Sequence, residues 1–189
     1  MKRRNLIIWR KNLKAYMYPK RVKAILKNIY QAEVIDVDDK NLTHDCILQK
    51  NSQTVTAEIK ERLFDKDNTP AHFYYQNDVL IELIQHMDRL AHPTTCNPKT
   101  LLTGFGWFFK SASDHLIYIS YLDDVKKKEV RVWDFNYREF KAWLMDNMFR
   151  LSHTNYKISN KTTGALNISV PIDIIPDRLY KEYKFDLGE

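Results

Sequence analysis

Strict alternation of apolar and polar residues in segment 54–60 is the feature that most limits how this chain can fold. The apolar residues are Val55, Ala57 and Ile59, and they alternate with Thr54, Thr56, Glu58 and Lys60. Because successive side chains of a β-strand point to opposite faces, this pattern predicts a strand that is buried on one side only. Glu58 and Lys60 then project side by side from its polar face.

Segment 45–50 precedes this strand and predicts its partner in a hairpin. If Asn51 and Ser52 form a two-residue loop, Asp45 lies directly opposite Glu58, with their Cβ atoms about 4.5–5.5 Å apart. Cys46 and Leu48 then oppose Ala57 and Val55 on the apolar face. Asn-Ser is a weaker hairpin signal than Asn-Gly, and a slip of one residue would turn Asp45 to the other face. This register is therefore a hypothesis.

The rest of the chain predicts further strands at 79–84, 115–122, 129–134 and 166–170, and a helix at 136–149. A first helix follows Pro19, because Val22, Ile25, Leu26 and Ile29 have amphipathic helical spacing. This order predicts an α/β (α+β) fold, with a central mixed β-sheet flanked by helices. The length of 189 residues, without repeats or a Gly/Ser linker, predicts one domain over 1–189.

Asp45 and Glu58, opposed in this way, would repel each other unless a cation lay between them. Their hard oxygen ligands suit Mg²⁺ or Mn²⁺, which could polarise a phosphate oxygen and activate a water molecule. Lys60 could orient that water or neutralise charge that develops on the phosphate. The alternative is an ordinary strand whose solvated face carries Glu and Lys.

Positive charge is concentrated at the start of the chain. Residues 1–32 hold ten of the 30 lysines and arginines and no Asp or Glu, so the remainder carries a net charge of −4. One interpretation is that this segment binds the phosphates of a nucleic acid. The residues predicted for it are Arg10, Lys11, Lys14, Lys20, Arg21, Lys23 and Lys27. A solvated helix face and a targeting or membrane-surface segment are the alternatives, although the absence of Ser in 1–32 argues against a transit peptide.

Several other functions find no support in the sequence. The six histidines lack metal-ligand spacing, and neither a nucleophile elbow nor a Gly-rich phosphate loop occurs. No apolar run approaches the length of a membrane span. Two distant cysteines, Cys46 and Cys96, are typical of a reduced, cytoplasmic chain, although one disulfide stays open.

Asp45, the hairpin and Glu58-Ile59-Lys60 together resemble the PD-(D/E)XK nuclease superfamily, with His44-Asp45 in place of the usual Pro-Asp pair. Segments 77–82 and 103–115 are similar to phage-type members. The resemblance implies a restriction-endonuclease-like core and Mg²⁺-dependent cleavage of nucleic acid, with DNA expected as the substrate. It also implies site roles: Asp45 and Glu58 as metal ligands, Lys60 as the catalytic lysine, Lys110 as a phosphate contact, and Glu82 and either Glu33 or Asp36 as auxiliary acids.

Two non-enzymatic alternatives stay open. One is a catalytically inactive nucleic-acid-binding or structural protein on the same fold, and the other is a module whose basic helix binds an acidic protein. Among enzymes, the sequence does not distinguish endonuclease from exonuclease. A homodimer also stays open, because cutting both strands of a duplex often needs two active sites.

Overall fold

The computed structural model describes residues 20–36, 44–62, 77–85, 104–121, 129–160 and 165–186. Its α-helices are α2 (Lys20–Tyr30), α5 (Trp107–Lys110) and α6 (Tyr137–Asn155). Its strands are β1 (Glu33–Asp36), β2 (Cys46–Lys50), β3 (Gln53–Arg62), β4 (Asp78–Ile84), β5 (His115–Tyr121), β6 (Glu129–Asn136), β7 (Tyr156–Asn160), β8 (Ala165–Pro171) and β9 (Tyr180–Asp186). Two short 3₁₀ turns, Ile172–Ile174 and Asp177–Leu179, connect β8 to β9.

The strands form two sheets, and the fold is a mixed α/β arrangement around a central mixed sheet. That sheet has six strands in the order β1-β2-β3-β5-β6-β9, with β3 and β5 parallel and the other neighbours antiparallel. The second sheet is antiparallel, in the order β4-β8-β7. The strands predicted at 79–84 and 166–170 therefore exist but pair with each other, outside the central sheet. Strands β1, β7 and β9 are additions to the predicted set.

The predicted hairpin register is confirmed. Cys46 pairs with Ala57, and Leu48 pairs with Val55. Asn51 and Ser52 both have positive φ angles, of 48° and 67°. Positive φ at both central residues is the requirement of a type I′ turn, whose twist matches that of the two strands. The turn thereby fixes which face each side chain of β3 occupies.

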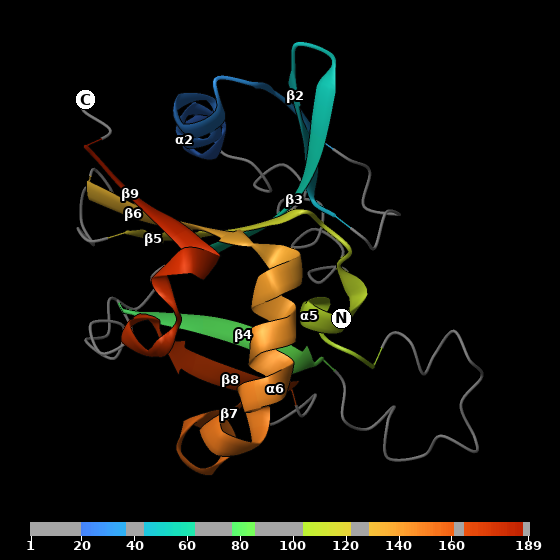
Figure 1. Ribbon diagram of the computed structural model, residues 1–189, viewed down its shortest axis with the longest axis vertical. Coiled ribbons are helices and arrows are strands. Elements are labelled where there is room, and N and C mark those ends of the chain that lie inside the picture. The colour runs from blue at the N-terminus through green and yellow to red at the C-terminus, as the bar shows by residue number, and fades with distance from the viewer. Residues whose placement is uncertain are drawn as a thin grey trace, which may run out of the picture.

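Each face of the central sheet has its own apolar core, and Figure 1 shows the layers that result. Along β5, Ile117 and Ile119 belong to the core beneath α2, whereas Leu116 and Tyr118 belong to the core shared with α6 and the second sheet. This is the period-two alternation of a strand buried on both sides. Across the described residues, we find no helix with both the length and the apolar character needed to cross a membrane.

The C-terminal end of α2 is fixed to the sheet by a polar contact. The Tyr30 hydroxyl lies 3.4 Å from Nδ1 of His115, and the same nitrogen lies 2.7 Å from Oδ1 of the buried Asp134. The hydrogen bond to Asp134 raises the pKa of His115; burial opposes this rise, and Asp114 and Lys181 add smaller effects of opposite sign. Folding thus shifts the equilibrium of the imidazole toward its protonated form.

We expect His115→Gln to lower the free energy of unfolding by about 2 kcal/mol at pH 6, because it removes a charge-assisted bond from a buried carboxylate. A histidine whose pKa is raised on folding contributes its full stabilisation below its unfolded pKa of about 6.5 and loses it as pH rises through the folded pKa. The difference between wild type and variant, measured by urea denaturation, should therefore shrink between pH 6 and pH 9. A difference that is constant across this range would contradict the prediction.

Candidate active site

The candidate site lies at the start of the β2–β3 hairpin, on the face of the central sheet away from α2. The backbone N–H of Asp45 donates to the carbonyl of Ala57 over 2.9 Å, which continues the hairpin ladder by one residue. The Asp45 Oδ2 atom accepts a hydrogen bond of 2.8 Å from the backbone N–H of Ile59. The two strands therefore fix the aspartate beside Glu58 and Lys60.

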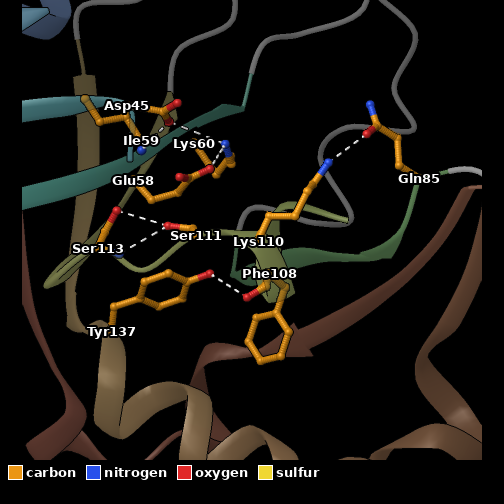
Figure 2. Close-up of polar contacts among 10 residues, drawn as sticks. All are labelled: Asp45, Glu58, Ile59, Lys60, Gln85, Phe108, Lys110, Ser111, Ser113 and Tyr137. Carbon is orange, nitrogen blue, oxygen red and sulfur yellow. Dashed lines mark hydrogen bonds and ion pairs between the residues drawn. The ribbon is translucent and has the colours of Figure 1, made fainter. Parts of the chain in front are cut away.

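Lys60 connects the two acidic side chains (Figure 2). Its Nζ atom lies 3.5 Å from Oδ2 of Asp45 and forms an ion pair with Oε1 of Glu58. The same ammonium group lies 4.9 Å from the centre of the Trp107 ring, within cation–π distance. The predicted catalytic trio is thus brought together in one place.

The carboxyl group of Glu58 is almost fully buried, with 5% of the residue exposed. Burial raises the pKa of Glu58, and the nearby Asp45 carboxylate raises it further, against the opposing effect of Lys60. Burial alone would lower the pKa of Lys60, but the charges of Asp45 and Glu58 outweigh burial and raise it. Lys60 is therefore held as a cation, and additional positive charge near Glu58 would favour the ionised carboxylate.

The segment that follows α5 forms the floor under Glu58. Ser111 is buried, lies beside Glu58, and has its Oγ atom 3.0 Å from that of Ser113. The hydroxyl of Tyr137, the first residue of α6, donates to the carbonyl of Phe108 over 3.3 Å. Lys141, one turn further along α6, donates from Nζ to the Ser111 carbonyl. Helix α6 thereby holds the floor of the site.

Helix α5 owes its position to a close contact with strand β4. The backbone N–H of Gly106 donates to the Leu83 carbonyl over 2.8 Å, and Phe105 forms a bridge with Ile84. A Cβ atom on residue 106 would lie 2.1 Å from the carbonyl oxygen of Glu82, so only glycine fits here. This contact places Trp107 and Lys110 at the same cavity as Asp45.

These side chains enclose an open cavity of about 200 Å³. Its lining consists of His44, Asp45, Glu58, Lys60, Trp107, Lys110 and Ser111. Lys110 donates from Nζ to Oε1 of Gln85 over 3.0 Å, as Figure 2 shows. The cavity therefore combines two carboxylates with two ammonium groups, which is a suitable lining for a phosphate that approaches together with a metal ion.

The donor set at this cavity fits a hard divalent cation bound through few protein ligands. Mg²⁺ commonly binds one or two carboxylates and keeps several waters, and Asp45 and Glu58 offer two. Within the described part of the chain, no group of three or more His, Cys, Asp or Glu residues is arranged to hold a metal. A bound ion would therefore need water or substrate oxygens to complete its coordination.

Two of the predicted auxiliary acids, Glu33 and Glu82, do not line this cavity. Glu33 is exposed on β1 and lines a separate hollow of about 660 Å³ beside α2, together with Lys23 and Lys27. Asp36 pairs through its backbone with Cys46, and Glu82 packs against Gly106 without lining the cavity. Neither Glu33 nor Glu82 therefore joins the Asp45–Glu58 pair.

The described residues that were predicted to bind phosphate lie in two different places. Lys20, Arg21, Lys23 and Lys27 lie on α2, which covers the other face of the central sheet, and Lys110 lines the cavity. The other three predicted contacts, Arg10, Lys11 and Lys14, lie outside the described residues. Of the two cysteines, Cys96 also lies outside the described residues, and Cys46 is a buried thiol. Among the predicted phosphate contacts that the structure describes, Lys110 is thus the one that lines the same cavity as Asp45 and Glu58.

Sequence reasoning missed His44, Trp107 and Ser111 as parts of the site. Trp107 belongs to an aromatic run that divides between two environments: Phe108 is buried at 1% exposure, whereas Phe109 is 42% exposed. Ser111 directly follows Lys110, and the predicted role of Lys110 was the feature of the sequence that pointed to this segment as part of the site. Without the pairing of residues 104–106 with the end of β4, nothing in the sequence places Ser111 under Glu58.

Comparisons with protein-family models, curated proteins and solved structures found no match to this chain. The functional assignment therefore depends on the geometry of the site.

Proposed function

We propose that the protein is a metal-dependent nuclease that hydrolyses phosphodiester bonds in nucleic acid, with DNA as the expected substrate. The observation that carries this proposal is the convergence of Asp45, directly before β2, and of Glu58 and Lys60, on β3, on one open cavity. The parallel pairing of β3 and β5 next to this hairpin also supports the restriction-endonuclease-like core that the sequence resembles.

Each residue of the trio has a distinct role in this proposal. Asp45 and Glu58 hold Mg²⁺ or Mn²⁺, which when bound supplies Lewis acidity and an activated water. The backbone N–H of Ile59 orients Asp45 through a hydrogen bond, and Ser111 packs beside Glu58. Lys60, whose raised pKa keeps it protonated, donates hydrogen bonds to the attacking water or to the phosphate oxygens as negative charge develops there.

A second function is favoured by the ion pairs of Lys60. Its ammonium group contacts both carboxylates and so compensates their charge without a metal ion. A protein of this kind would bind nucleic acid through its basic residues and leave the strand intact. Binding without cleavage in Mg²⁺ would favour this alternative.

The test is cleavage of supercoiled plasmid DNA in Mg²⁺ and in EDTA, by wild type and by Lys60→Met. We expect cleavage by wild type only in Mg²⁺ and a rate about 10²–10³-fold lower for Lys60→Met, because the variant keeps the length of the side chain but loses its charge. Lys184→Met is a matched control, since Lys184 lies on β9 at the opposite edge of the central sheet. Equal cleavage by all three proteins would overturn the proposal.

A further inference from the structure

A second cavity adjoins the candidate active site and shares the Ser111 segment with it. Its volume is about 440 Å³, which is within the range of ligand pockets. The lining consists of Ser111, Ala112, Ser113, Asp114, His115, Asn136, Arg138 and Lys141. Ser111 lines both cavities, so the second cavity begins where the lining of the first one ends.

The side chains of this second cavity favour an anion. Arg138 is exposed and Lys141 is half-buried. The Lys141 ammonium lies 4.6 Å from the centre of the Tyr137 ring, so its position is fixed by packing as well as by its bond to Ser111. Arg138 forms no ion pair with any described residue. Its guanidinium is therefore available for the bidentate contact that this group makes with phosphate.

Asp114 is the only carboxylate among the described residues that line this cavity, and it is engaged elsewhere. Its Oδ2 atom accepts hydrogen bonds of 2.8 Å from both the backbone N–H and the hydroxyl of Thr56. These bonds lower the pKa of Asp114 and hold its charge toward β3. The carboxylate thus joins β5 to β3 and leaves the two cations to define the character of the cavity.

Two backbone N–H groups at the start of α6, those of Tyr137 and Glu139, already have partners, so recognition would not depend on the helix end alone. The backbone N–H of Glu139 donates to Oδ1 of Asn136 over 3.3 Å, and Nδ2 of Asn136 donates to Oε1 of Glu139 over 3.1 Å. The N–H of Tyr137 donates to the Asp114 carbonyl. Recognition would come from the side chains of Arg138 and Lys141.

From this geometry we infer a second phosphate-binding subsite, formed by Arg138 and Lys141, for the nucleotide next to the scissile bond. The inference rests on the proposed function, because it takes the ligand to be the strand that the active site cleaves. Lys141 would serve both cavities, since it also supports the floor of the active site. The subsite would hold the strand in line with Glu58, on the side of Ser111 away from Lys110.

The experiment measures binding of a fluorescein-labelled 30-nucleotide DNA strand by anisotropy, with Ca²⁺ in place of Mg²⁺, over a series of salt concentrations. We expect Arg138→Gln to weaken binding about five- to tenfold and to reduce the slope of log K against log salt by about 0.7, the value for one lost phosphate contact on a single strand. Arg150→Gln is the matched control: it lies on the same helix, is exposed, and removes the same charge. We expect it to change affinity less than twofold.

Equal losses in Arg138→Gln and Arg150→Gln would overturn the subsite, because they would indicate a general effect of net charge. A second arm titrates inorganic phosphate by calorimetry. If Arg138→Gln abolished phosphate binding but left DNA binding unchanged, the cavity would be a site for free phosphate, which would also overturn the inference. Because both arms measure binding, a wild type that binds DNA without cutting it would contradict the proposed nuclease activity and leave this test intact.

Discussion

Replacing Glu58 with alanine is expected to lower the rate of Mg²⁺-dependent DNA cleavage by about 10³-fold or more. In the proposed site Glu58 is one of two carboxylates available to the metal, and it is the more deeply buried of the two, since 6% of its side chain is exposed compared with 23% for Asp45. Without it, the cavity would hold a single carboxylate that is already paired with Lys60. Cleavage of plasmid DNA under single-turnover conditions measures the effect.

Two further variants make the Glu58 result specific. Glu58→Gln keeps the size of the side chain and removes its charge, so it should be as inactive as the alanine variant while retaining the thermal unfolding midpoint within a few degrees. Glu61→Ala removes a carboxylate from the same strand, but Glu61 does not line the cavity. This variant should therefore cleave DNA at the wild-type rate. Full activity in Glu58→Gln would show that no ionised carboxylate is required at this position.

Gly106→Ala is expected to lower the free energy of unfolding by about 3 kcal/mol and to abolish activity as well. The backbone angles of residue 106, φ −72° and ψ 171°, suit alanine, so the cost is steric. The added methyl group would lie 2.1 Å from the carbonyl oxygen and 2.5 Å from the carbonyl carbon of Glu82. Because the contacted atoms belong to the backbone of a paired strand, the clash is relieved only if segment 104–106 moves away from β4.

That movement would carry the active site with it. Trp107, Lys110 and Ser111 all follow Gly106 within five residues and line the cavity. Ala112→Ser is a control for stability in the same segment, because Ala112 is exposed and lies beyond α5. Urea denaturation of the two variants checks the prediction, and a loss below 1 kcal/mol in Gly106→Ala would contradict it.

The sequence was informative where local rules decide the structure. Alternation in 54–60 and the two-residue loop at Asn51-Ser52 predicted the register of the β2–β3 hairpin, because a period of two and a tight turn leave one pairing that buries Val55 and Ala57. Helix α2 was equally predictable from the sequence, since its buried residues follow the helical period. The expected meeting of Asp45, Glu58 and Lys60 follows from that register alone.

Short and polar elements were harder to predict. Strand β1 has four residues, too few for a periodic pattern, and β9 is an edge strand with a largely exposed face. The separation of β4 and β8 into their own sheet has no local signal, because strands of either sheet have the same period. Partner choice depends on which apolar faces can be buried together.

The sequence by itself therefore determined the hairpin, its register and the side-by-side placement of Glu58 and Lys60, since these depend on neighbours in the chain. Only the tertiary structure decided what surrounds them: Gly106 against β4, Ser111 beneath Glu58, and Arg138 and Lys141 beside Ser111. It also placed the basic helix α2 on the face of the sheet opposite Glu58. These contacts join segments that are more than 20 residues apart in the chain. They are fixed by the packing of two apolar cores, one on each face of the central sheet.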